Sequence, residues 1–537
     1  MNVSKKLLYA IVSGVALALG WPSIGSFYPL LFVALIPLFL LERQVYDDHV
    51  NNKPSKLFPY VYLSLIVFNV LTTWWVWHAS APGSVVAIVL NSLFIAITIQ
   101  LAHFTRKKLG HFRGDLALIF FWIAWEYFHL DWDLSWTWLT LGNGFANAPY
   151  LVQWYEYSGV FGGSLWILLS NVILTQWIYK SQHRQIPIFS IPNIPVLFKW
   201  ALVLLIPVIS SLYRFYTYEE KSNPVEVLSI QPNIDPYNEK FGSLSSADQV
   251  QKMFNLAEQK ITPQTEFVIF PETAIPKAFD EDLFEDTREF QIIESFYQKH
   301  PNARIVIGAS TFVVYGPGDQ IPYTARQANS GIMYDYCNTA ISVGADSEPE
   351  FYHKSKMVPG PEKMPFPKLL KPLQDAVFDL GGTTGTLGSQ KERSVFTSSQ
   401  HHKAGPIICY ESVYGAFVGE YVQQGAEILF IITNDGWWQD TPGYKQHALY
   451  AQLRAIEHRR SIARSANTGT SCFINQKGQT SQNTKWWVED AILGQINAND
   501  TITFYSKYGD LLGRISLGFG ALLLIMAISR GLMKKDD

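Results

Sequence analysis

Eight apolar segments constrain what this chain can fold into more than any other feature of its sequence. They cover residues 7–20, 24–41, 57–77, 84–104, 115–130, 160–179, 196–213 and 511–529. A helix that crosses a membrane needs about 20 mostly apolar residues, and most of these segments approach that length. We therefore predict eight transmembrane helices, about seven of them in residues 1–213 and the last, with a short tail, in residues 511–537.

The N-terminus has an alternative interpretation as a cleaved secretory signal peptide. Lys5 and Lys6 precede the first apolar segment, as the basic residues of such a peptide do. However, no clear cleavage site of small residues lies before Trp21-Pro22, and further apolar segments follow at once. We therefore expect an uncleaved first span.

The distribution of basic residues predicts the orientation of the spans. Short loops on the cytoplasmic side of a membrane are enriched in Lys and Arg. Here basic residues occur near both ends of the chain and in alternate loops, whereas the loops at 21–25, 78–83 and 131–159 contain none. We expect both termini in the cytoplasm and residues 214–510 on the opposite side, which is the periplasm in a bacterial cell.

Residues 214–510 form too long a connection to be a loop. Short runs rich in β-forming residues alternate there with amphipathic stretches. The expected strands are 225–230, 267–270, 304–308, 339–343, 406–409, 428–433, 461–466 and 471–475, and the expected helices are 245–261, 285–299, 412–424 and 444–459. This alternation is typical of a layered α/β domain, and continuous apolar runs indicate strands buried on both faces. The fold class is thus an α/β domain joined to an all-α membrane part.

Charge and cysteine content argue against several classes of function. The chain has 537 residues and a net charge of −3, which gives no support for binding of nucleic acid. Its three cysteines, Cys337, Cys409 and Cys472, are too few and too far apart for a disulfide framework or a zinc site. We expect no metal and no organic cofactor, and a monomer is the simplest assumption. Cys337 and Cys472 are interpreted as small buried hydrophobic residues.

Cys409 is the first candidate for a catalytic residue. It ends the apolar run of Gly405-Pro-Ile-Ile-Cys-Tyr-Glu411, and the helix expected next would bring backbone N–H groups close to its sulfur. A thiolate is a strong nucleophile near neutral pH, and its thioester reacts readily with amines. The N–H of Tyr410 would then help to bind an oxyanion. The alternative is a buried strand cysteine without a catalytic role.

Two charged residues complete a candidate site for acyl transfer. Glu272 follows the apolar run Phe267-Val-Ile-Phe270, and partial burial there would raise its pKa and suit it to act as a general base. Lys354, after Tyr352-His353, would stabilise an oxyanion and lower the pKa of the thiol. Taken singly, a carboxylate at a helix start and a solvated surface lysine explain these residues as well.

Three further carboxylates are weaker candidates. Glu362 lies in the proline-rich loop Val358-Pro-Gly-Pro-Glu362, and Glu411 is two residues beyond the thiol. Either would be able to position Lys354 or a substrate amine, and either is equally compatible with a structural role. Glu126 falls inside a predicted span, where a carboxylate is costly, so it is either functional or satisfied by a neighbouring helix.

The motifs in their order along the chain resemble a known enzyme superfamily. Pro-Glu-Thr-Ala-Ile-Pro, Tyr-x-Lys-x-x-x-Val-Pro-x-x-Glu, Ile-Cys-Tyr-Glu and Thr-Asn-Asp-Gly-Trp-Trp occur at 271–276, 352–362, 408–411 and 433–438. They resemble the nitrilase superfamily with its Glu-Lys-Cys triad. With apolar spans on both sides, essentially the whole chain is similar to the bacterial apolipoprotein N-acyltransferase family. One departure is Val358-Pro-Gly-Pro-Glu362, where that family commonly has Val-Pro-Phe-Gly-Glu, and it affects the reach of Glu362.

The resemblance implies a nitrilase-like αββα sandwich inserted in an eight-span transmembrane bundle of the bacterial inner membrane. It also implies a reaction in which Cys409 takes a fatty acyl chain from the sn-1 position of a phospholipid such as phosphatidylethanolamine. The α-amine of the S-diacylglyceryl cysteine that begins an apolipoprotein would then attack the thioester. Glu272 would be the base and Lys354 the oxyanion partner.

The same resemblance gives supporting roles to Glu362, Tyr410 and Glu411. Trp437, Trp438 and Phe366, the last within the segment 366–370, are expected to contact substrate or membrane.

Three rival interpretations compete with this one. A membrane-tethered amidase or nitrilase would use the same triad with water as the acceptor, but a small soluble substrate needs no bilayer access. A silent scaffold or a transporter would have no use for an intact Glu272, Lys354 and Cys409, and a transporter should have more paired polar groups in its spans. A Cys-His mechanism through His447 has no supporting motif.

Overall fold

The computed structural model describes residues 2–187, 190–366 and 386–533. The chain divides into two compact units. The first comprises Met1–Trp77, Ala81–Thr217 and Tyr508–Asp537, and the second comprises His78–Ser80 and Tyr218–Lys507.

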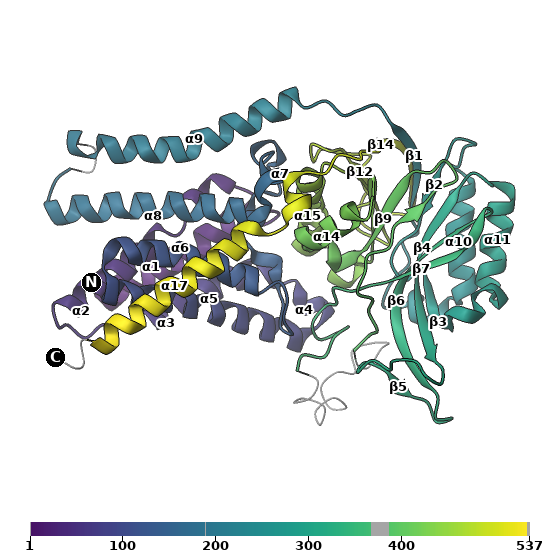
Figure 1. Ribbon diagram of the computed structural model, residues 1–537, viewed down its shortest axis with the longest axis horizontal. Coiled ribbons are helices and arrows are strands. Elements are labelled where there is room, and N and C mark those ends of the chain that lie inside the picture. The colour runs from purple at the N-terminus through teal and green to yellow at the C-terminus, as the bar shows by residue number, and fades with distance from the viewer. Residues whose placement is uncertain (1, 188–189, 367–385, 534–537) are drawn as a thin grey trace. The chain divides into compact units, whose positions relative to one another are not determined.

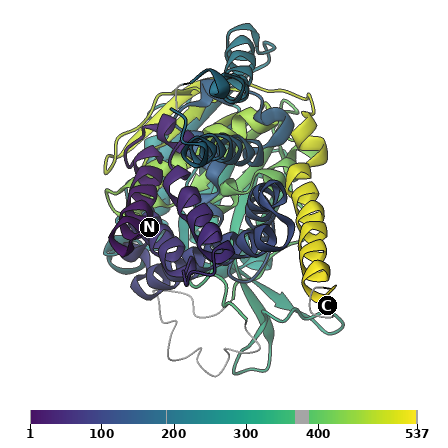
Figure 2. The ribbon, with the colours of Figure 1, turned by 90° about the vertical axis from the view of Figure 1, so that its left-hand side faces the viewer.

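The first unit is helical. Its longer helices are α1 (Val3–Gly20), α2 (Ile36–Val50), α3 (Phe58–Thr73), α5 (Ala81–Leu109), α6 (His111–Phe128), α8 (Val160–Arg184), α9 (Ile194–Thr217) and α17 (Leu511–Met533), joined by the short helices α4 (Val76–Ala79) and α7 (Tyr155–Ser158). Each of the eight predicted apolar segments overlaps one or more helical elements. The helix α17, yellow in Figures 1 and 2, packs along α5 and α6.

Six helical segments among the described residues are long and apolar enough to cross a membrane. They are Val3–Gly20, Tyr28–Val50, Ala81–Leu109, Val160–Arg184, Ile191–Thr217 and Leu511–Met533, and Phe58–Thr73 is a shorter apolar helix. The prediction of several apolar helices in the first part of the chain is confirmed.

The buried arginines Arg43 and Arg106 of this unit are paired with carboxylates. Arg106 of α5 bonds Glu42 of α2 at 2.9 Å and Asp115 of α6 at 2.8 Å, and Arg43 also bonds Asp115. Such pairing is required for ionised groups that lie away from water. Glu126 accepts hydrogen bonds from the Leu141 N–H at 2.8 Å and from Trp122 Nε1 at 3.1 Å, so its carboxylate is held within the helical unit.

The second unit contains two sheets. The larger has eight strands in the order β14-β1-β2-β4-β6-β5, with β3 paired to β4 and β7 to β6. Its strands are β1 (Pro224–Gln231), β2 (Phe267–Ile269), β3 (Ile275–Asp280), β4 (Arg304–Tyr315), β5 (Arg326–Gln327), β6 (Met333–Gly344), β7 (Ser347–His353) and β14 (Asp490–Asn497). The pairs β1–β2, β2–β4 and β3–β4 are parallel.

The smaller sheet has six strands in the order β13-β12-β11-β10-β9-β8. These are β8 (Phe396–Thr397), β9 (Lys403–Ile408), β10 (Ile428–Thr433), β11 (Ser461–Ala466), β12 (Cys472–Ile474) and β13 (Thr480–Ser481). The central strands β9, β10 and β11 are parallel. Every residue of β10 is buried, which confirms the expectation drawn from its continuous apolar run, and every residue of β11 is buried as well.

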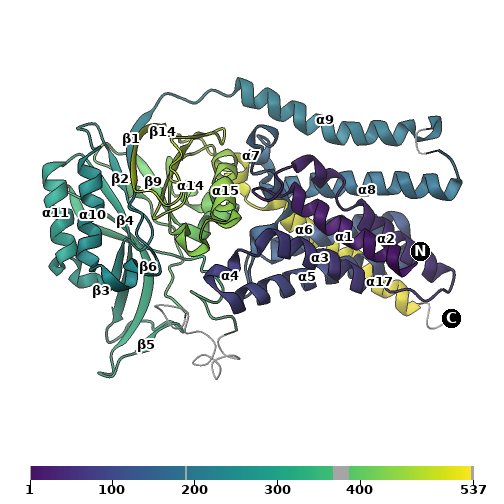
Figure 3. The same cartoon turned by 180° about the vertical axis from the view of Figure 1, so that it is seen from behind.

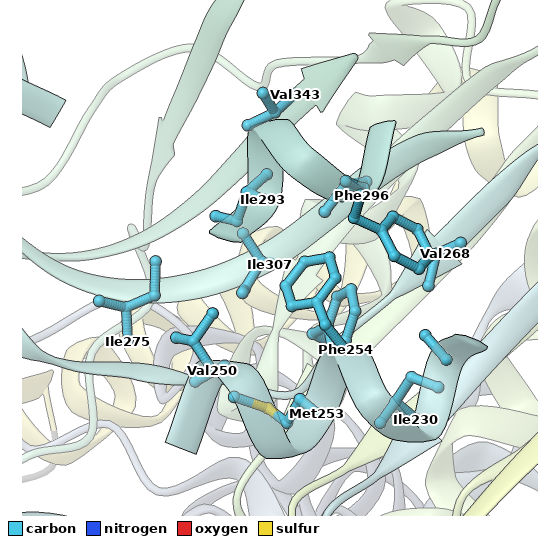
Figure 4. Close-up of a cluster of buried hydrophobic side chains, with 14 of the residues drawn as sticks. Ile230, Val250, Met253, Phe254, Val268, Ile275, Ile293, Phe296, Ile307 and Val343 are labelled. Atoms are coloured by element: carbon cyan, nitrogen blue, oxygen red, sulfur yellow. The ribbon is translucent and has the colours of Figure 1, made fainter. Parts of the chain in front are cut away.

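Helices cover the outer face of each sheet. Figures 1 and 3 show α10 (Ser246–Glu258) and α11 (Arg288–Lys299) side by side on the larger sheet, while α14 (Gly415–Gln423) and α15 (Pro442–His458) pack on the smaller one. A short helix, α16 (Phe504–Tyr508), follows β14. Between the first helix pair and its sheet, Phe254 and Phe296 interlock with Val268 and Ile307 in the cluster of Figure 4. The amphipathic faces that the sequence predicts therefore cover the sheet.

The two sheets also pack on each other. The rings of Phe267 on β2 and Phe430 on β10 meet edge to face with centroids 4.9 Å apart. The hydroxyl of Ser229 on β1 donates to the backbone oxygen of Arg464 on β11, and Ser465 donates back to Ile230. The layers thus run helix, sheet, sheet, helix, and the predicted α/β fold of this unit is confirmed.

Candidate active site

The candidate residues come from the ends of strands. Glu272 lies three residues beyond β2, Cys409 directly follows β9, and Asn434 directly follows β10. Parallel strands bring their carboxyl ends to one edge of a sheet, where α/β proteins place their sites. Lys354 directly follows β7, an antiparallel strand of the larger sheet. Both sheets therefore contribute residues to one site.

Lys354 joins the two carboxylates that the sequence singled out. Its Nζ lies 3.0 Å from Oε1 of Glu272 and 2.7 Å from Oε1 of Glu362. Lys354 is 1% exposed and Glu272 6%, so these charges interact in a medium much less polar than water. Glu362 therefore reaches the lysine despite the altered loop Val358-Pro-Gly-Pro-Glu362. The second carboxylate oxygen of Glu362 accepts the N–H of Val358 at 2.8 Å, which holds the side chain against its own loop.

Two asparagines that the sequence analysis did not single out hold Glu272 in place. Asn338 of β6 donates to Oε1 of Glu272 at 2.8 Å and to Glu362 at 3.2 Å. The backbone N–H of Asn434 donates to the other oxygen of Glu272 at 3.1 Å. Asn434 lies in the Thr-Asn-Asp-Gly-Trp-Trp motif, whereas Asn338 had only the signal of a polar residue within a buried strand.

The backbone next to Glu272 is close-packed. A Cβ atom on Gly308 of β4 would lie 2.5 Å from the oxygen of Pro271 and 2.6 Å from both Cα of Glu272 and N of Thr273. Only glycine allows β4 to approach so closely. Thr273 itself has a φ of 49°, in the left-handed region that costs a residue with a side chain about 1–3 kcal/mol. The segment that carries Glu272 is thus held in a single strained position.

Cys409 has the same kind of backbone conformation. Its φ is 51°. The sequence suggested that Cys409 ends the strand, whereas the structure shows it as the first residue of the 3-10 turn Cys409–Val413. The Ser412 hydroxyl donates to the Cys409 carbonyl at 2.8 Å, and Nε2 of His447 lies 3.2 Å from the same oxygen. His447 in turn contacts Asp435 at 3.0 Å. These contacts stabilise the strained backbone at Cys409, where the chain changes direction after β9.

Glu411 does not extend the Lys354 cluster but ties two strand ends together. Its carboxylate accepts the N–H of Ser355 at 2.7 Å and the N–H of Ile408 at 2.8 Å. The Tyr352 hydroxyl donates to it as well, at 2.7 Å. Ser355 follows Lys354 and Ile408 precedes Cys409, so Glu411 fixes the spacing of these two residues through their backbones. Tyr410 is buried and stacks edge to face on Tyr414.

The pKa of Glu272 differs from the expectation drawn from the sequence. Burial raises the pKa of Glu272, but the charge of Lys354 and hydrogen bonds from Lys354 and Asn338 outweigh it and hold the pKa below its usual value. The predicted rise is therefore wrong: Glu272 is ionised at neutral pH. Burial, with the nearby Glu272 charge, raises the pKa of the Cys409 thiol, although the charge of Lys354 and a hydrogen bond with Thr433 act to lower it. The resting site holds a carboxylate beside a neutral thiol.

Lys240 is a further charged residue that the sequence gave no reason to select. It lies in the turn Glu239–Ser243, is 3% exposed, and its Nζ donates to the backbone oxygen of Glu272 at 3.0 Å. Burial lowers its pKa to about 8, although the charges of Glu272 and Cys409 act to raise it. An isolated lysine outside a motif is ordinarily a solvated surface residue, so only the fold reveals its position.

The residues predicted to contact substrate or membrane are partly or largely exposed to solvent. The ring of Trp437 packs on Tyr237 and Phe241, and Trp438 stacks edge to face on His447. Phe366 is 40% exposed, and residues 367–370 of the same predicted segment lie outside the described part of the chain.

The two remaining cysteines are buried in strands. Cys337 lies in β6 and Cys472 in β12, as expected for small hydrophobic residues. Within the described ranges, no group of three or more His, Cys, Asp or Glu residues is arranged to hold a metal ion.

The fold and the site define an enzyme class. Residues 229–505 match the family described as carbon-nitrogen hydrolase, which is more than half of the chain. This protein belongs to the carbon-nitrogen hydrolase family.

The rest of the chain narrows the relationship. Residues 13–173 match the family described as the apolipoprotein N-acyltransferase N-terminal domain. The apolipoprotein N-acyltransferase of Chlorobaculum tepidum is 29% identical over 98% of this chain and 97% of that protein. Those of Geobacter metallireducens and Haemophilus influenzae are 25% and 24% identical, over 97% and 99% of this chain and 95% and 96% of their own lengths. The resemblance to this family is confirmed.

Proposed function

We propose that this protein transfers a fatty acyl chain from a phospholipid, through a thioester on Cys409, to the α-amine of the N-terminal S-diacylglyceryl cysteine of apolipoproteins. The observation that carries the proposal is the buried cluster in which Lys354 bridges Glu272 and Glu362 beside Cys409. Its occurrence in a chain whose relatives are named apolipoprotein N-acyltransferase over nearly their full length supports the choice of substrates.

In the first step, Glu272 takes the proton of the Cys409 thiol and the sulfur attacks the ester carbonyl of the phospholipid. Lys354, together with the N–H of Tyr410, stabilises the oxyanion of the tetrahedral intermediate. When this intermediate collapses, the C–O bond to glycerol breaks and Glu272 returns its proton to the leaving oxygen. The products are a lysophospholipid and the Cys409 thioester.

In the second step, the α-amine of the acceptor attacks the thioester carbonyl. Glu272 takes a proton from the attacking nitrogen, the C–S bond breaks, and Glu272 returns that proton to the departing sulfur. The acyl chain is now held by an amide. The ionised state of Glu272 suits both steps, because a carboxylate is able to accept a proton and a carboxylic acid is not. Glu362, Tyr410 and Glu411 act in support.

The membrane arrangement is part of the proposal. We propose eight spans, with a membrane bundle in residues 1–213, the catalytic domain in residues 214–510 on the periplasmic side, and a last span with a cytoplasmic tail in residues 511–537. Both substrates carry lipid chains, so an enzyme anchored in the same bilayer meets them by diffusion in two dimensions. Trp437, Trp438 and Phe366 contact lipid, phosphatidylethanolamine is the donor, and the enzyme acts as a monomer.

Intact-mass measurement tests the first step. The purified protein is incubated with phosphatidylethanolamine and without an acceptor, alongside Cys409→Ala. We expect a mass increase of one fatty acyl group that maps to Cys409 and is absent from the variant. An unmodified Cys409 that still reacts with an alkylating reagent would overturn the proposal and favour hydrolysis of a small amide.

A further inference from the structure

The charges around Lys354 do not balance without another cation. Lys354 bonds two carboxylates, Glu272 and Glu362, so these three groups carry one excess negative charge. Asp435 is neutralised separately by Arg464, at 2.7 Å. An uncompensated negative charge in a buried site is unfavourable, and it would also oppose a negative charge on the nearby sulfur.

Lys240 has the position and the charge to compensate. It is almost fully buried, and Glu272 and Cys409 are the titratable groups that act on it. Among the described residues, the Glu272 backbone oxygen is the only hydrogen-bond acceptor of its ammonium group, which has three donors. A buried lysine whose hydrogen-bond partner is a neutral carbonyl adds little to stability. The burial of a charged group at this position therefore needs a further reason.

We propose that Lys240 is a positioning residue whose ammonium balances the second carboxylate of the site and thereby stabilises the thiolate of Cys409. The inference rests on the proposed role of Cys409 as the nucleophile. With Lys240 protonated, Glu272, Glu362, Lys354 and Lys240 sum to zero. Transfer of the thiol proton to Glu272 then moves a negative charge from oxygen to sulfur without changing the net charge of the site.

The hydrogen bond from Lys240 also holds the strained segment that carries Glu272. A structural role through this hydrogen bond and an electrostatic role through the charge predict different behaviour of variants. Lys240→Gln keeps a donor for the Glu272 carbonyl and loses the charge. Lys240→Arg keeps both, and Lys240→Met loses both.

The rate at which iodoacetamide alkylates Cys409 in the full-length protein, measured from pH 6 to 10 by peptide mass spectrometry, separates these roles. Alkylation requires the thiolate but no phospholipid and no acceptor, so its result does not depend on whether the protein is an acyltransferase. The titratable groups around Cys409 in this experiment are Glu272, Lys354, Asp435 and Lys240, with His447 of α15 at its carbonyl oxygen. Lys277→Met removes an exposed lysine from β3 and serves as the matched control.

We expect Lys240→Gln and Lys240→Met to alkylate about tenfold more slowly than the wild type at pH 7, where Lys240 of the wild type is charged. A rise of about one unit in the pKa of the thiol lowers the thiolate fraction tenfold. Lys240→Arg should stay within about threefold, and Lys277→Met should match the wild type. If Lys240→Met fails to fold, the comparison of the Gln and Arg variants still decides. A wild-type rate and pH profile for Lys240→Gln would overturn the proposal, and it would do so even if acyl transfer itself were demonstrated.

Discussion

Glu272 keeps its negative charge in a buried position because donors from three parts of the chain surround its carboxylate. Lys354, Asn338 and the N–H of Asn434 all donate to it. A carboxylate so stabilised remains ionised at a pH where an isolated buried one would be protonated. A residue in such a dry environment is thus able to accept a proton, as the role proposed for Glu272 requires.

Substitution of Glu272 by glutamine tests this role. Glutamine has the same shape but does not accept a proton at neutral pH, so formation of the acyl-enzyme should slow by about 10²- to 10⁴-fold. The rate is measured by intact mass after mixing with phosphatidylethanolamine, with the exposed residue Glu285 changed to Gln as a control. A Glu272→Gln variant that acylates within threefold of the wild type would remove the base assignment.

The pH dependence follows from two residues with lowered pKa values. Glu272 stays ionised until the pH falls below its lowered pKa, so acylation should persist in mildly acidic solution. Lys240, with a pKa of about 8 instead of 10.5, loses its charge as the pH rises through about 8. The rate of acyl-enzyme formation should therefore stop rising above that pH in the wild type, whereas Lys240→Arg should extend the rise to higher pH. Identical profiles for the two proteins would contradict this account.

At the scale of the elements, the site depends on strand ends that are locked by their neighbours. β2 and β9 deliver Glu272 and Cys409, and each strand is followed by a backbone turn of positive φ, at Thr273 and at Cys409. β4 supports the first turn through Gly308, and the contacts of Ser412 and His447 support the second. Residues in such conformations persist only where the surrounding structure fixes them.

Gly308→Ala tests the first of these supports. Its new Cβ would lie 2.5–2.6 Å from backbone atoms that do not move as flexible side chains do, so the Glu272 segment must shift. We expect a lower rate of acyl-enzyme formation, by tenfold or more, in a protein that remains folded by circular dichroism. A Cβ on Gly316, which directly follows β4, would meet Asp319 at 3.6 Å, so Gly316→Ala should behave as the wild type. Full activity of Gly308→Ala would show that this close packing does not position Glu272.

Sequence patterns predicted the central strands and the helices of the second unit well, because their apolar runs are continuous and their helical faces amphipathic. β10 and β11 were expected at the bounds that the structure gives them. Short edge strands such as β5 and β13 were missed, since two residues carry no periodic signal.

The same limit applies to the site. Residues within ordered motifs, such as Cys409 and Lys354, were selected from the sequence, whereas Lys240 and Asn338 are brought to Glu272 only by contacts distant in sequence. The pKa of Glu272 was predicted in the wrong direction, because burial was visible in the sequence and the direct contacts of the carboxylate with Lys354 and Asn338 were not.

At the scale of the whole molecule, one chain combines apolar helices with the proposed site for acyl transfer, so the orientation of the chain in the membrane decides which side the site faces. The proposed topology is tested by thiol labelling in cells whose outer membrane is permeable to the reagent. Asp319→Cys, in an exposed loop of the second unit, should react with a membrane-impermeant reagent, and Lys53→Cys should react only after the inner membrane is disrupted. The native cysteines are buried and give the background rate. The opposite pattern would invert the orientation.

The central claim is that the acyl group passes from Cys409 to an amine and not to water. The most direct test isolates the acyl-enzyme with a deuterated chain, adds a peptide that begins with S-diacylglyceryl cysteine, and follows the label by mass spectrometry. We predict that the label leaves Cys409 and appears on the peptide as an amide, while little is released without the peptide. Release of the label as free fatty acid at the same rate with and without the peptide would contradict the account and identify a hydrolase.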